Sequence, residues 1–111
     1  MTVVETPGFL RDAATAMAES ERDEVVSFLA ANPDAGDVMP DTGGARKLRW
    51  RAPGRGKRGG FRVIYYYHNE SIPLFILDIY AKNPKADLSE SDKRSLQRVL
   101  AQIPSQYIKR S

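Results

Sequence analysis

The chain has 111 residues, one histidine (His68) and no cysteine, and its formal net charge is +3. This length fits one domain over residues 1–111. The lack of cysteine excludes disulfides, thiolate metal sites and a cysteine nucleophile, and a single histidine argues against a Ser-His-Asp triad or a multi-histidine metal site. Because no apolar stretch approaches about 18 residues and no basic segment opens the chain, we expect a cytoplasmic protein without a membrane span or signal peptide.

The N-terminal part of the chain predicts one strand, two helices and a loop. A β-branched run over 2–5 favours a strand, and Thr6 followed by a first-turn proline favours a helix over 7–18. A sequence like a capping box opens a second helix over 20–31. The short link between the two helices predicts an antiparallel helical hairpin, and the composition of residues 32–45 is that of a loop.

The rest of the chain predicts three strands and a final helix. Residues 47–51 alternate between basic and apolar side chains, 61–68 are rich in tyrosine, and 72–80 form a nearly continuous apolar run. Short turns between these strands favour antiparallel pairing. A capping box at Ser89 opens the last helix, and Pro104 is expected to close it. We therefore expect an α+β domain, a mostly antiparallel four-stranded sheet with its helices packed on one face.

Basic residues are concentrated in one short segment. Residues 1–44 hold two basic and nine acidic side chains, 45–62 hold eight basic and no acidic ones, and 63–111 hold seven basic and five acidic ones. A cationic segment of this kind points to a polyanion such as nucleic acid. A solvated basic face without a specific partner is the alternative.

The alternation in 47–51 orders these cations in space. In a strand, Lys47, Arg49 and Arg51 share one face, and Arg62 on the next strand can lie beside them. A phosphodiester backbone would neutralise such a row, whereas a strand edge protected by charge against aggregation is the alternative. The candidate nucleic-acid-binding residues are Arg46, Arg49, Arg51, Arg55, Lys57 and Arg58.

Aromatic residues near the ends of two strands are further candidates. Tyr80 and Lys82 lie two positions apart, so a phenol and an ammonium on one side could exchange a proton and stabilise an oxyanion. The tyrosines at 65–67 must divide between the two faces of their strand. Packing is the main interpretation for them and base stacking the alternative, while His68 is interpreted as a surface residue.

Three motifs occur in the chain in a specific order: GDV…TGGARKLRW over 36–50, GKRGGFRVIYY over 56–66 and IYAKN over 79–83. Together they resemble the RelE/HigB-type toxins of bacterial toxin–antitoxin systems, most closely the HigB branch of the RelE/ParE superfamily. The similarity covers nearly the whole chain and is strongest over 36–84. It implies the RelE/ParE-like fold, which agrees with the expected order of elements.

The resemblance also implies an activity and its partners. Such toxins are ribosome-dependent endoribonucleases, or mRNA interferases, in which the 2′-hydroxyl attacks the adjacent phosphate to give a cyclic phosphate without a metal or other cofactor. The implied partners are the ribosome, mRNA and a cognate antitoxin of helix-turn-helix type. A ParE-like toxin that poisons gyrase and a non-catalytic basic nucleic-acid-binding module are the alternatives.

Site residues are carried over by position from the same resemblance. Lys47 and Arg49 match the basic pair on the strand after the helices, and Arg62 matches the arginine that opens the next strand. Lys82 matches the cation just past the last strand. Residues 57–58 match the loop motif of the HigB branch, for which the resemblance implies phosphate binding.

Two residues are candidates for the general base. The family has a tyrosine in its C-terminal segment, where this chain reads KADL over 85–88. Tyr80 is the nearest substitute, and Lys47 is the other candidate because surrounding cations would favour its neutral, basic form. The candidate catalytic residues are Lys47, Arg62, Tyr80 and Lys82.

Overall fold

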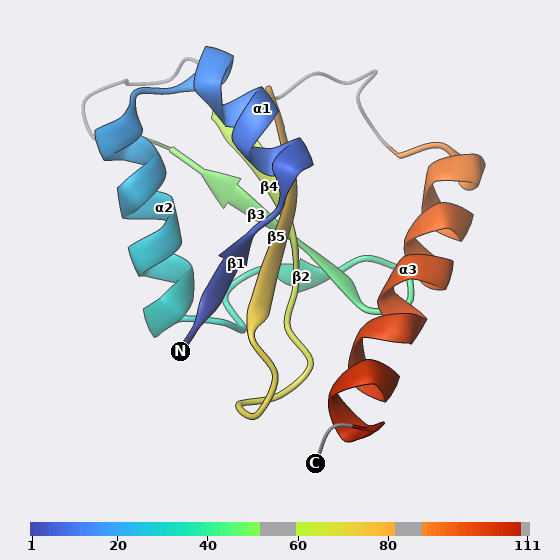
Figure 1. Ribbon diagram of the computed structural model, residues 1–111. Helices are drawn as coiled ribbons and strands as arrows, with labels where there is room; N and C mark the ends of the chain where they lie inside the picture. The colour runs from blue at the N-terminus through green and yellow to red at the C-terminus, as the bar shows by residue number, and fades with distance from the viewer. Residues whose placement is uncertain (52–59, 82–87, 110–111) are drawn as a thin grey trace.

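The computed structural model describes residues 1–51, 60–81 and 88–109 (Figure 1). The elements in chain order are β1 (Val3–Glu5), α1 (Pro7–Ala16), α2 (Glu19–Ala31), β2 (Asp37–Val38), β3 (Ala45–Trp50), β4 (Phe61–Tyr66), β5 (Leu74–Ala81) and α3 (Glu90–Lys109). None of the helices in the described part is long and apolar enough to cross a bilayer.

One sheet organises the fold, with strand order β1-β5-β4-β3-β2. β1 runs parallel to β5 and the other pairs are antiparallel, which confirms the α+β class and the pairing of the last three long strands. The sheet has five strands rather than the expected four. The extra strand, β2, falls within the segment that we expected to be a loop. It pairs through two residues with Arg46 and Lys47 of β3, and two residues are too few to show an alternating pattern.

Helices cover both faces of the sheet, so the expectation of a single covered face was wrong (Figure 1). α1 and α2 contribute Phe9 and Leu29 to one buried cluster, whereas α3 contributes Leu100 to a second. β4 separates the two clusters, with Tyr65 in the first and Tyr66 in the second. Burial of a strand on both faces requires a covering layer on each side, and α3 supplies the second layer.

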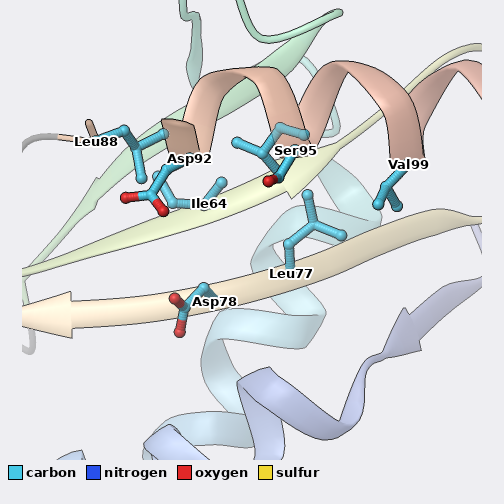
Figure 2. A pocket seen from close by; sticks show the side chains of 8 residues that line it. Ile64, Leu77, Asp78, Leu88, Asp92, Ser95 and Val99 are labelled. Atoms are coloured by element: carbon cyan, nitrogen blue, oxygen red, sulfur yellow. The ribbon is translucent and has the colours of Figure 1, made fainter. Parts of the chain in front are cut away.

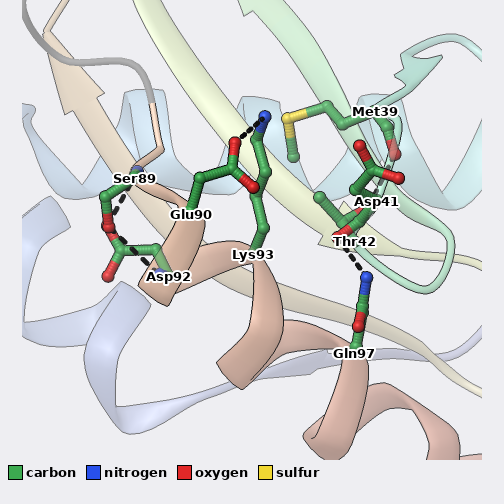
Figure 3. Close-up of polar contacts among 8 residues, drawn as sticks. All are labelled: Met39, Asp41, Thr42, Ser89, Glu90, Asp92, Lys93 and Gln97. Carbon is green, nitrogen blue, oxygen red and sulfur yellow. Dashed lines mark hydrogen bonds and ion pairs between the residues drawn. The ribbon is translucent and has the colours of Figure 1, made fainter.

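Two of the three expected helix starts are confirmed. The Thr6 hydroxyl oxygen accepts the Phe9 N–H at 3.4 Å and donates to the Ile76 carbonyl at 2.7 Å, which ties the start of α1 to β5. At α3, Asp92 N–H donates to Ser89 Oγ at 3.1 Å and Ser89 N–H to Asp92 Oδ2 at 3.3 Å, a reciprocal capping box (Figure 3).

The start of α2 and the end of α3 differ from expectation. α2 begins at Glu19 behind Ala18, with no side-chain cap, so the expected capping box at Ser20 was wrong. α3 continues through Pro104 to Lys109 instead of closing there. A proline inside a helix removes one intrahelical hydrogen bond, but α3 continues past Pro104 despite this loss.

A β-bulge in β5 places a carboxyl group against α1. Ile64 pairs with Asp78 and the next residue of β4 with Ile76, so Leu77 is left over. The pKa of Asp78 is raised from 3.8 to about 6, first by burial and then by the hydrogen bond with Asp12 of α1. A hydrogen bond from the Ile79 N–H, 2.8 Å from Asp78 Oδ1, acts in the opposite direction.

Asp78→Asn is expected to remove a pH dependence of folding. The pKa of Asp78 is higher in the folded than in the unfolded chain, so between about pH 4 and 6 the folded chain binds more protons than the unfolded one. The contribution of Asp78 to the free energy of unfolding is therefore present at the acidic end of this range and is lost as the pH rises through 6. With allowance for solvent screening, the free energy of unfolding of the variant should exceed that of wild type by about 1–2 kcal/mol at pH 7.5. Urea unfolding at pH 5 and 7.5 measures this, with exposed Asp23→Asn as the control; equal pH dependence in Asp78→Asn and wild type would contradict it.

Candidate functional site

Three strands bring two arginines and a tyrosine into one row across the sheet. Arg62 of β4 is paired with Arg49 of β3 on one side and with Tyr80 of β5 on the other. Directly paired residues present their side chains on the same face. Tyr80 packs against the cluster that contains Leu100 of α3, so the row lies on the α3 face of the sheet.

Lys47 joins this row at a hollow beside Tyr80. Lys47 lies two residues before Arg49 in β3 and therefore points to the same face. A hollow of about 180 Å³ has both Lys47 and Tyr80 in its wall. The remaining lining residues are Met39, Pro40, Leu88 and Lys93. The two candidates for the general base therefore share one cavity.

The three cations that β3 and β4 bring to this site have no anionic partner in the described part of the chain. Lys47, Arg49 and Arg62 form no ion pair with any residue placed by the structure, and Nη1 of Arg62 is buried without a hydrogen-bond partner there. Arg49 and Arg62 are also directly paired, and like charges in such a position repel. An anion bound on this face would reduce the repulsion between the arginines and accept a hydrogen bond from the unsatisfied donor.

A larger hollow of about 330 Å³ lies between α3 and the sheet (Figure 2). Its wall is mainly apolar, with Ile64, Leu77 and Val99 among the lining residues, and the carboxylate of Asp92 also belongs to it. None of the sequence-predicted site residues lines it within the described ranges. The smaller hollow, with its cations and phenol, is therefore the one with reactive chemistry.

Of the other candidate residues, the structure places Arg46 away from this face. Arg46 is paired with Tyr65 and points to the α1–α2 side, where its Nη1 donates to the Gly36 carbonyl at 2.8 Å and to the Asp34 carbonyl at 3.3 Å. It ties the preceding loop to β3. Arg51 is exposed just beyond the end of β3. Four candidates lie outside the described residues: Arg55, Lys57, Arg58 and Lys82.

The tyrosines of β4 pack inside the protein, which confirms the main interpretation of their pattern. Tyr65 is fully buried, its hydroxyl accepts the Gly36 N–H at 2.7 Å, and burial raises its pKa. Tyr66 is 5% exposed, and burial raises its pKa as well. Its hydroxyl lies 3.2 Å from Nδ1 of His68, an exposed residue outside the cationic row.

Sequence reasoning missed Lys93, and with it the contribution of α3 to the site. Lys93 lies in the first turn of α3, far along the chain from the basic segment. No local pattern marks it, because only the packing of α3 on this face brings it near Lys47. Within the described ranges, no group of three or more His, Asp or Glu side chains could hold a metal ion.

A comparison with protein families identifies the family to which this chain belongs. Residues 11–109 match the family model described as the RelE toxin of the RelE / RelB toxin–antitoxin system. The matched range includes β3, β4 and β5, which carry the row of Arg49, Arg62 and Tyr80, and α3, which contributes Lys93 to the smaller hollow, called the cationic hollow below. The chain belongs to the RelE family of toxins, the toxin component of toxin–antitoxin systems.

Proposed function

We propose that this toxin is an endoribonuclease that cleaves mRNA on the ribosome and so inhibits translation. The observation that carries the proposal is the row of Arg49, Arg62 and Tyr80 beside Lys47, with cations that no described residue neutralises. A phosphodiester supplies the missing negative charge. The motif over 56–66 supports placing the chain in the HigB branch of the family.

The chemistry that fits this site is attack by the substrate's own 2′-hydroxyl. The 2′ oxygen forms a bond to the adjacent phosphorus, the P–O5′ bond breaks, and the products are a 2′,3′-cyclic phosphate and a 5′-hydroxyl. Lys47 or Tyr80 takes the proton of the 2′-hydroxyl, and the other of these two residues or a water molecule gives a proton to the leaving 5′ oxygen. Arg62 and Arg49 stabilise the phosphorane, which carries more negative charge than the ground state. No step of this scheme uses a metal ion.

Partners follow from the family and from the charge of the surface. A toxin of this family pairs with an antitoxin, and we propose one with a helix-turn-helix domain. Arg51, Arg55, Lys57 and Arg58 of the basic segment would bind phosphates of mRNA or ribosomal RNA, and Lys82, past the end of β5, stays a candidate catalytic residue. Such contacts release counterions, so binding should weaken steeply with salt.

We expect the protein to cleave mRNA on programmed ribosomes. Cleavage of the same RNA free in solution should be at least tenfold slower. The hollow offers few groups for proton transfer, and each well-tuned acid or base contributes about 10²–10⁴-fold. Orientation of the RNA by the ribosome must therefore supply more of the rate, and in-line geometry is worth several kcal/mol.

Labelled mRNA, with and without programmed ribosomes at equal salt, tests the proposal when the new RNA ends are mapped. New ends that carry a cyclic phosphate, found mainly in the ribosome sample, are the expected result. Equal rates in both samples would contradict ribosome dependence. Intact RNA with gyrase–DNA adducts in a parallel assay would instead indicate a ParE-like toxin, and binding without either product a non-catalytic module.

A further inference from the structure

α3 reaches over the cationic hollow with one basic side chain. Leu88, just before the helix, and Lys93, in its first turn, line the hollow together with Lys47 and Tyr80. The side chain of Lys93 is 28% exposed, and its Nζ lies 3.5 Å from Oε1 of Glu90. One side of the hollow is therefore formed by a cation of α3, whereas Lys47 and Tyr80 come from the strands β3 and β5.

Two contacts hold this part of α3 in place (Figure 3). The Ser89–Asp92 capping box fixes the first turn of the helix, as described above. One turn after Lys93, Nε2 of Gln97 donates to the Asp41 carbonyl at 2.6 Å. Asp41 follows directly after Met39 and Pro40, which also line the hollow. The start of α3, and with it Lys93, is thus tied to the segment that carries Met39 and Pro40.

The Glu90–Lys93 pair leaves Lys93 available to an additional anion. The Glu90 side chain is 78% exposed, and an exposed ion pair of this kind contributes only about 0–1 kcal/mol. An ammonium has three donors, so it can keep Glu90 and still bind a phosphate oxygen. Arg94 and Arg98 lie on the same helix but are exposed and are not among the residues that line the hollow.

We propose that Lys93 binds a backbone phosphate of the RNA in the hollow and that Glu90 positions its ammonium group. This inference rests on the proposed function, because it assumes an RNA strand at Lys47 and Tyr80. α3 then acts as the third wall of the substrate site in addition to covering the sheet. Because Lys93 belongs to α3 and not to the row of Arg49, Arg62 and Tyr80, its loss weakens binding more than the chemical step.

Binding of a non-cleavable 2′-O-methyl RNA and single-turnover cleavage on ribosomes test this for Lys93→Ala. We expect about a tenfold weaker Kd for the RNA and a salt dependence whose logarithmic slope is smaller by about 0.7, the loss of one single-strand phosphate contact. The toxin concentration for half-maximal cleavage should rise by a similar factor while the maximal rate changes less than threefold. Lys93→Arg should retain most of the binding.

Matched variants separate this role from general charge and from structure. Arg94→Ala removes the same charge one residue away and should leave Kd and cleavage unchanged, while Glu90→Gln should weaken binding less than Lys93→Ala. Equal losses in Lys93→Ala and Arg94→Ala, or an unchanged Kd and slope in Lys93→Ala, would overturn the inference. A wild-type protein that binds RNA with this Lys93 dependence but does not cleave it would contradict the proposed function alone.

Discussion

Replacing Arg62 with alanine is expected to lower the rate of ribosome-dependent cleavage by about 10²–10³-fold, the usual effect of removing one donor to a transition-state oxyanion. Arg62 is the middle residue of the row, between Arg49 and Tyr80, and its buried Nη1 has no partner among the described residues. A donor held in this way needs no reorganisation when charge develops on the phosphate. Its contribution is therefore larger in the transition state than in the ground state.

The stability of the Arg62→Ala variant should change by less than about 1 kcal/mol, because no described residue pairs with the guanidinium and Arg49 repels it. Urea unfolding therefore separates a loss of catalysis from a loss of folding. Arg62→Lys keeps the charge but loses the planar fork and should recover only part of the rate. Exposed Arg98→Ala on α3 is the control for net charge. A full cleavage rate in Arg62→Ala would remove this residue from the site.

Gly36→Ala is expected to lower the free energy of unfolding by about 2–3 kcal/mol, as is typical of overpacking in a core. A Cβ at this position would lie 2.8 Å from Cε1 of Tyr65 and 2.9 Å from the carbonyl oxygen of Lys47. Neither neighbour can move easily, since the Tyr65 ring is fully buried and Lys47 is held in β3 by its pairing. Any shift would also strain the 2.7 Å hydrogen bond from the Gly36 N–H to the Tyr65 hydroxyl.

Gly8→Ala is the matched control for this substitution. At Gly8, in α1, an added Cβ would lie 3.5 Å from the Leu77 carbonyl oxygen, an ordinary van der Waals contact. Alanine there should stabilise the helix by about 0.5–1 kcal/mol. Urea unfolding of the two variants should thus give changes of opposite sign. A Gly36→Ala protein as stable as wild type would show that the loop before β2 can move away from β3.

Local patterns in the sequence were enough to predict most of the elements and part of the site. Period-two alternation over 47–51 correctly places Lys47 and Arg49 on one face of β3, because successive side chains of a strand alternate whatever surrounds them. Arg46 is one of the candidate nucleic-acid-binding residues, but it points to the opposite face, as the same alternation requires. Caps at Thr6 and Ser89 were equally readable, since each depends on residues within one helical turn.

The expected place of Arg62 beside the cations of β3 is confirmed by its pairing with Arg49, but only the tertiary structure showed which other residues join them. The row of Arg49, Arg62 and Tyr80 depends on the registers of two strand pairs, one of which contains the bulge at Leu77, and composition does not encode such an offset. The pairing of β2 and the placement of Lys93 beside Lys47 depend on contacts between segments far apart in the chain. The sequence by itself therefore determined most of the elements and the faces of the side chains in its alternating strand. Packing across the sheet determined the site, because long-range contacts have no local signature.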